Sequence, residues 1–87
     1  MKKIIETNTE DELKGFLGKK VVFMCSNYFY TGKLIGINEV YYILENPSII
    51  YETGAWQEKN WENCESMNIP QTQIMANAVE CFFETSK

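Results

Sequence analysis

Between residues 19 and 46 the chain carries three apolar runs separated by two polar steps. The runs are KKVVFMC, YFYTGKLIGI and VYYILEN, and the polar steps are Ser26-Asn27 and Asn38-Glu39. Valine, isoleucine, phenylalanine and tyrosine dominate the runs, and these residue types are enriched in strands. The pattern therefore predicts a three-strand meander.

The chain continues with signals for further strands. Asn46-Pro47-Ser48 follows the third run, and because proline cannot donate to a central ladder, we expect a bulge or bend there before SIIYE resumes. The final stretch, QTQIMANAVECFFE, predicts one or two closing strands that break near Ala76-Asn77. The expected fold class is therefore mainly β.

A short helix is predicted in front of the sheet. Thr9 and Glu12 have the spacing of a capping box, in which the two side chains satisfy the first amides of a helix. One apolar face follows, made of Leu13, Phe16 and Leu17. Gly18 suits the left-handed residue that ends many helices. We expect a helix over about residues 9–17 that packs on the sheet.

Two glycines, Gly32 and Gly36, interrupt the second predicted strand. Glycine in a strand interior marks a bulge or a sharp bend, where no Cβ crowds the inside of the corner. Short strands, a strongly bent second strand and a helix at an open end together indicate a small five-stranded open barrel. We expect a single domain over residues 1–87, with the barrel over about residues 19–84.

Composition and charge bear on partners. The 87 residues include 45% hydrophobic residues, enough for a folded core, and the net charge is −4. Residues 1–44 hold six lysines and five acids, whereas residues 45–87 hold two lysines and seven acids. All eight cationic residues are lysine, so the chain lacks the arginine that makes bidentate phosphate contacts. Charge alone does not favour nucleic acid.

Location and redox state are predicted from simple counts. No run approaches the roughly 18 apolar residues of a membrane span, and the opening MKKII turns polar at Glu6, so we expect a cytoplasmic protein that does not engage a membrane. Cys25, Cys64 and Cys81 are far apart and odd in number, which favours reduced thiols. Cys25 and Cys81 lie in apolar runs, where we expect small buried side chains.

Enzymatic chemistry is not indicated. The chain has no histidine, no glycine-rich phosphate loop, and no serine or cysteine beside a recognisable base. Glu62 and Glu65 flank Cys64, but acids in a polar stretch are usually solvated rather than metal-bound. We expect no catalytic residue, no metal and no cofactor.

Residues 53–69, TGAWQEKNWENCESMNI, form a polar, acidic stretch that contains both tryptophans. Two interpretations are open. Trp56 and Trp61 either form an exposed surface that contacts a protein partner, or they pin a long loop to the barrel.

The order of these segments resembles the Sm and Sm-like (LSm) family, particularly its small phage-borne and bacterial members. The first family motif corresponds to residues 32–38 with residues 43–46, and the second motif falls on residues 74–79. The resemblance covers most of the chain and implies a bent five-stranded barrel with an enlarged variable loop over about residues 53–69.

The resemblance also implies a candidate RNA site, with substitutions. Asn38 stands where the family has aspartate, the family's asparagine falls on Tyr41 or Tyr42, and Met75-Ala76 replaces its Arg-Gly step. The family's uridine pocket is therefore not expected unchanged. Tyr41 either stacks on a base or packs against a neighbouring subunit. The candidate nucleic-acid contacts are Asn38, Tyr41 and Asn77.

Finally, the resemblance implies self-assembly, because an open barrel leaves strand edges unpaired. The edges are expected at residues 64–69 and 72–84, and their pairing between subunits gives a homo-oligomeric ring of about five to seven chains. Weak binding of single-stranded RNA is the first functional hypothesis. The alternative is a non-enzymatic structural or interaction ring, for example a phage accessory protein, that meets a protein through Trp56 and Trp61.

Overall fold

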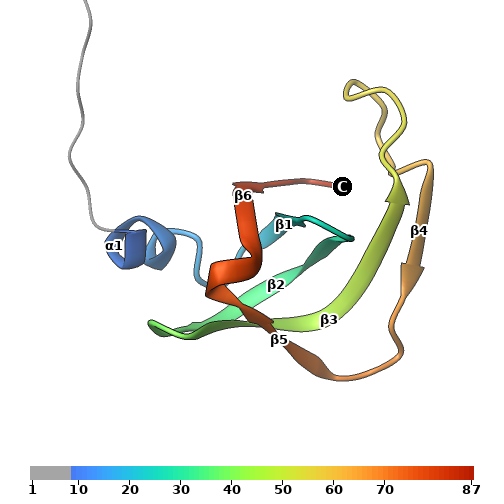
Figure 1. Ribbon diagram of the computed structural model, residues 1–87. Coiled ribbons are helices and arrows are strands. Elements are labelled where there is room, and N and C mark those ends of the chain that lie inside the picture. The colour runs from blue at the N-terminus through green and yellow to red at the C-terminus, as the bar shows by residue number, and fades with distance from the viewer. Residues whose placement is uncertain (1–8) are drawn as a thin grey trace, which may run out of the picture.

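A computed structural model describes residues 9–87, and the side chains from residue 12 onward. The chain is mainly β with one short α-helix and one 3-10 turn, as predicted (Figure 1). In chain order the elements are α1 (Thr9–Lys14), β1 (Lys20–Cys25), β2 (Phe29–Ile37), β3 (Tyr41–Glu52), β4 (Asn63–Ser66), β5 (Gln71–Met75), η1 (Ala76–Ala78) and β6 (Val79–Glu84).

All strand pairs are antiparallel, in the order β4-β3-β2-β1-β6, and β5 also pairs with β3. The predicted meander is β1, β2 and β3. The described strands number six rather than the expected five, because β4 and β5 share one strand position: β4 pairs with the second half of β3, at residues 48–52, and β5 with its first half, at residues 41–45. The predicted break near Ala76-Asn77 is η1, which separates β5 from β6.

The sheet bends where β2 crosses β3. Two residues of β3, Asn46 and Pro47, oppose one residue of β2, Gly32, so this is a β-bulge. Asn46 has a positive φ of 50°. A Cβ on Gly32 would lie 2.9 Å from the backbone oxygen of Glu45, closer than real Cβ atoms come. Glycine at this position therefore allows the two backbones to approach closely. β3 is strongly curved along its length (Figure 1).

Gly36 marks a second irregularity of the same strand pair. The register shifts between Leu34 and Gly36, and a Cβ on Gly36 would lie 3.0 Å from Cδ1 of Ile43. That neighbour is the end of a flexible side chain, which can move, whereas the neighbour of Gly32 is backbone. Gly32 is thus the stricter of the two positions.

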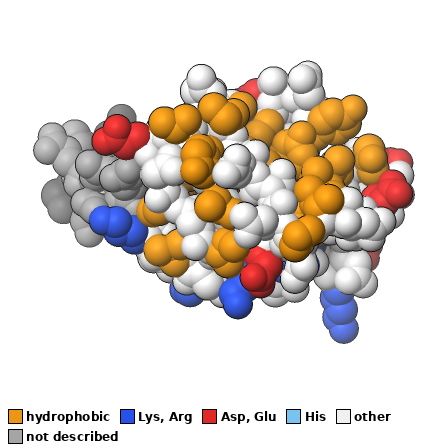
Figure 2. Space-filling model, turned by 90° about the horizontal axis from the view of Figure 1, so that it is seen from below, with side chains coloured by type: hydrophobic (Ala, Val, Ile, Leu, Met, Phe, Trp, Pro, Cys, Tyr) orange, Lys and Arg blue, Asp and Glu red, His pale blue; other side chains and the backbone are white. Residues whose placement is uncertain are grey.

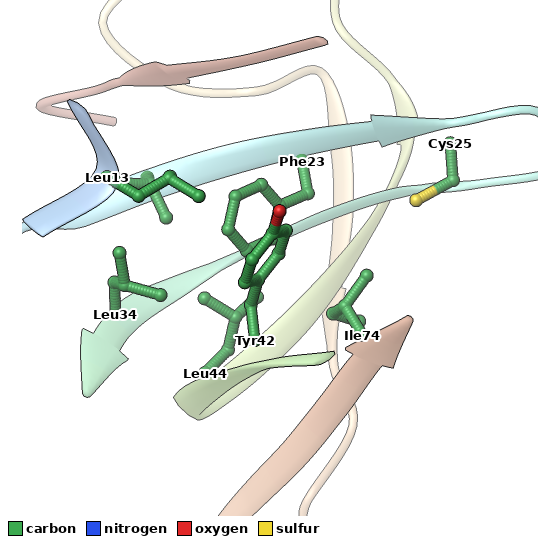
Figure 3. Close-up of a cluster of buried hydrophobic side chains, with 8 residues drawn as sticks. Leu13, Phe23, Cys25, Leu34, Tyr42, Leu44 and Ile74 are labelled. Atoms are coloured by element: carbon green, nitrogen blue, oxygen red, sulfur yellow. The ribbon is translucent and has the colours of Figure 1, made fainter. Parts of the chain in front are cut away.

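The bend encloses a core between the strands and the helix. Figure 3 shows Leu13 of α1 beside Phe23 of β1, whose ring centroid lies 5.3 Å from that of Tyr42. A second, smaller cluster joins three buried residues near the other end of the sheet, namely Val22, Ile50 and Trp61. The apolar positions of the first three strands thus supply most of the core, as their alternation predicts.

The helix is shorter than predicted. α1 ends at Lys14 instead of about residue 17, because the next amides bond to carbonyls three residues back, as in the 2.9 Å bond from Phe16 N to Leu13 O. Gly18 has the predicted positive φ, 85°, and its amide donates to the carbonyl of Leu34 in β2. Leu17 is exposed, so it does not join the apolar face. The side chain of Thr9, and with it the proposed capping box, lies outside the described residues.

Two other expectations differ from the structure. The loop predicted over residues 53–69 contains β4, because residues 63–66 pair with the end of β3 despite their polar composition, and the irregular loop is limited to residues 53–62. Cys81 was expected to be buried but is exposed, because the side-chain alternation of β6 turns it away from the core, while Cys25 is buried as expected.

We expect Gly32→Ala to lower the free energy of unfolding by about 1–3 kcal/mol, because the added methyl group meets backbone that cannot move without distorting the bulge. Urea denaturation followed by circular dichroism measures the change. Gly15→Ala is the matched control, since its Cβ would lie 3.4 Å from the nearest atom, Glu12 O. Equal destabilisation of both variants would contradict the role of the close approach.

Candidate nucleic-acid interface

The turn of residues 38–40, which joins β2 to β3, is organised by one side chain. The Asn38 side-chain oxygen accepts hydrogen bonds from the amides of Val40 and Tyr41, both at 2.8 Å. The Asn38 amide in turn donates to the Tyr41 carbonyl at 3.0 Å. Asparagine side chains commonly close turns in this way. Asn38 therefore has a structural role, and only its side-chain NH2 group is left for a ligand.

The 3-10 turn η1 lies against this turn. The Ala76 amide donates to the Val40 carbonyl at 2.8 Å, and Tyr41 is the register partner of Met75. The structure thus brings the segments that carry Asn38, Tyr41 and Asn77 to one edge of the sheet. Two segments far apart in sequence meet there because β5 pairs with the first half of β3.

The side chains on this edge differ in exposure. Asn38 and Asn77 are exposed and Tyr41 is half-buried. Val40 and Met75 are also exposed, which adds two apolar side chains that the sequence did not single out as site residues. Their signal was present: Val40 directly precedes Tyr41, and Met75 lies two positions before Asn77. The edge therefore offers an aromatic ring, apolar contacts and amide groups, with no cation among these residues.

Positive charge is sparse on the neighbouring surface. Figure 2 shows that apolar and uncharged polar side chains occupy most of one face, and that Lys, Asp and Glu lie mainly near its margin. Some lysines also have acidic neighbours: Lys19 Nζ lies 3.7 Å from a carboxylate oxygen of Glu84, and Lys33 is the register partner of Glu45. Any contact with nucleic acid would depend on stacking and apolar packing more than on phosphate neutralisation.

The two tryptophans lie at the other end of β3, in the loop of residues 53–62. Trp61 is buried, with 8% of its surface exposed, and packs in the smaller core cluster. Trp56 is 57% exposed, and its ring stands at 88° to that of Trp61 with centroids 6.0 Å apart. Trp61 therefore suits the interpretation in which the tryptophans pin the loop to the barrel. Trp56 faces solvent and suits the interpretation of a surface for a protein partner.

The buried Cys25 thiol is not activated by its surroundings. Burial raises the pKa of the Cys25 thiol, and the negative charge of Glu80 adds to this. Burial also raises the pKa of Tyr30, with smaller contributions from Cys25 and Tyr28. Both groups therefore stay neutral at physiological pH, and a protonated thiol is a poor nucleophile.

The described residues show neither a metal cluster nor a membrane-spanning helix. Residues 9–87 bring together no group of three Cys, Asp or Glu side chains that could hold a metal ion. Within that range, no helix is long and apolar enough to cross a membrane.

The sequence matches no known family model and no curated protein. The structure, however, superposes on a solved structure of a Pyrococcus abyssii Sm protein in complex with a uridine heptamer, with a TM-score of 0.65 over 91% of this chain and 100% of that one. The chain has an Sm-like fold. Sequence identity between the two is 17%, so the likeness concerns the fold alone, and the uridine heptamer belongs to the Pyrococcus protein.

The Sm-like fold accounts for the arrangement described above. A short helix precedes a strongly bent antiparallel barrel, and the resemblance based on the two motifs is confirmed at the level of the fold. The likeness to small phage-borne and bacterial members stays a prediction. With so few identical residues, the chemistry of the site has to be argued from this chain's own side chains.

We expect Asn38→Ala to lower the free energy of unfolding by about 1 kcal/mol, because two backbone amides lose their acceptor. Asn38→Asp keeps an acceptor oxygen in the same place and is the matched control, which should retain most of the stability. Thermal and urea unfolding measure both variants. If the aspartate variant loses as much as the alanine variant, the turn does not depend on these hydrogen bonds.

Proposed function

We propose that this Sm-like chain assembles edge to edge into a homo-oligomeric ring, and that the ring binds single-stranded RNA weakly through residues 38–41 and 75–77. The observation that carries the proposal is the open sheet. Among the described strands, β6 pairs only with β1, while β4 and β5 pair only with β3. Both ends of the sheet therefore present unpaired backbone groups.

These edges need a partner. A bare strand edge is a template for pairing with another chain, and proteins normally cover it, charge it or pair it. The β6 edge, VECFFE, combines apolar residues with two acids and has no proline. Pairing β6 of one subunit with β4 and β5 of the next would satisfy both edges by one repeated contact. A head-to-tail contact of this kind closes into a ring when the rotation between subunits allows.

RNA binding is supported by the composition of the edge near η1. Tyr41 offers a half-buried ring that can stack on a base, and Asn38 and Asn77 carry amide groups that suit the edges of bases. In a ring, this surface would be repeated once per subunit, so weak contacts would add along one strand. The absence of arginine and the net charge of −4 keep each contact weak.

A second candidate function rests on the 57% exposure of Trp56. A ring that meets a protein partner through the acidic 53–62 loop would use this indole as its contact. Aromatic side chains exposed on a surface are frequent anchors of protein interfaces. This candidate needs no RNA.

Native mass spectrometry at low salt, without prior nuclease treatment, tests assembly. We expect a whole multiple of the 10.1 kDa chain mass, at about five to seven copies, plus additional mass that nuclease removes. A clean multiple without that additional mass would favour the protein-interaction ring. A monomer at micromolar concentration would contradict the pairing of the edges.

Tyr41→Ala tests the RNA surface. Loss of one stacked base should weaken binding of a single-stranded oligonucleotide by about 5- to 150-fold, from about 1–3 kcal/mol per base, while Tyr41→Phe keeps the ring and most of the affinity. Tyr51→Ala is the positional control, because Tyr51 is an exposed tyrosine at the far end of β3. Fluorescence anisotropy at several salt concentrations measures all three variants. Unchanged affinity in Tyr41→Ala would refute the proposed surface.

A further inference from the structure

Two indole rings lie over a lysine ammonium near the end of β3 opposite the proposed RNA surface, and a third aromatic ring packs beside them. Trp56 and Trp61 stand nearly perpendicular, and Phe83 of β6 packs at 71° against Trp56 with centroids 6.0 Å apart. Lys87 Nζ lies 4.4 Å from the centroid of Trp61 and 5.6 Å from that of Trp56. We call Trp56, Trp61 and Phe83 the aromatic cage. A cation over two ring faces within about 6 Å is a cation-π arrangement.

Backbone hydrogen bonds place Lys87 there. The Thr85 amide donates to the Lys20 carbonyl of β1 at 2.9 Å, which continues the pairing of β6. The Lys87 amide then donates to the Thr85 hydroxyl oxygen at 3.1 Å. The segment after β6 therefore runs toward the side of the molecule that carries the 53–62 loop (Figure 1).

The lysine fits the cage poorly in one respect. Its Nζ is buried, yet it makes no hydrogen bond within the described residues, and the Trp61 indole Nε1 is likewise buried without an acceptor. A primary ammonium carries three N–H donors, and burying donors without acceptors costs free energy. The cage supplies the faces of aromatic rings and leaves two donor groups unsatisfied.

A quaternary ammonium suits this environment better than lysine does. It has no N–H group to satisfy, and it presents methyl groups to the ring faces while keeping its positive charge. An oxygen beside that cation could accept from the Trp61 indole N–H. Net charge also favours a cation, since the half of the chain to which the cage belongs, residues 45–87, holds seven acids and two lysines.

From this geometry we propose that the aromatic cage is a binding site for a quaternary ammonium compound that carries an oxygen acceptor, and that Lys87 is its built-in competitor. The ligand enters when the flexible lysine side chain swings out into solvent. Trp56 forms the outer wall, because it is the exposed indole, and Trp61 forms the fixed inner wall. The site lies outside the proposed RNA surface, and all three of its rings come from one chain.

The chain's two tryptophans give two indole N–H signals in a nitrogen-15 correlation spectrum, so each wall of the cage has its own reporter. The probe is choline, which combines a trimethylammonium group with a hydroxyl. Its neutral isostere 3,3-dimethylbutan-1-ol is the ligand control, and sodium chloride at equal ionic strength is the salt control. We expect choline to shift both indole signals saturably, and neither control to do so.

Variants separate the cage from its competitor. Lys87→Ala removes the competitor and leaves all three rings, so choline affinity should rise about threefold or more, whereas Trp56→Ala removes the outer wall and should lower it about tenfold. Trp56→Phe keeps a ring if the alanine variant is poorly folded, and it should bind with intermediate affinity. The proposal is overturned if Lys87→Ala shows no saturable indole shift, or if the neutral isostere shifts the signals as choline does.

Discussion

The close approach of β2 to β3 at Gly32 is the constraint on which the rest of the molecule depends. One residue of β2 faces two residues of β3 there, and a Cβ would lie 2.9 Å from a backbone oxygen. Proline has no backbone N–H, so Pro47 can lie in the bulge without leaving a donor unsatisfied. The Pro47 carbonyl accepts a hydrogen bond from the Met67 amide at 3.0 Å. The same bulge also takes part in the break between β4 and β5, since the Asn46 amide donates to the Pro70 carbonyl. One bend thus shapes four strands, β2 to β5.

A sheet bent in this way has consequences for function. Its two halves enclose a core, yet the two edges of the sheet do not pair with each other among the described strands. β6 pairs only with β1, and β4 and β5 each pair only with β3. The helix and the turn that follows it cover part of the opening. Leu13 of the helix is fully buried, and the ring of Phe16 in the turn contacts that of Phe82 with centroids 5.9 Å apart. The helix does not pair with a strand, so the edges stay free. The fold is compact without being closed, and it is these free edges that motivate the proposed assembly.

The sequence predicted the features that local patterns encode. The meander was predicted from the apolar runs and the polar steps between them. The bulge was predicted from Pro47 and the bend from Gly32, because each depends on the backbone geometry of one or two residues. The division of β4 from β5 was not predicted, since it depends on where a distant bulge in β3 interrupts pairing. The candidate site was predicted only in part. The turn closed by the Asn38 side chain is local, but the contact of η1 with Val40 requires the pairing of β5 with β3 to be known.

The aromatic cage was beyond the sequence for a related reason. Two tryptophans in an acidic stretch are visible in the printed chain, but their perpendicular arrangement around Lys87 joins the 53–62 loop to a segment 26 positions beyond Trp61. The candidate binding surfaces at both ends of β3 depend on the faces of aromatic rings. Other proteins use arginine or metal ions to bind charged ligands. A ring face can receive a neutral base or a cation, but it does not neutralise phosphate. With a net charge of −4, such a surface favours cations over polyanions. The same chemistry would keep the proposed RNA contact weak, and it favours the proposed ammonium ligand of the cage.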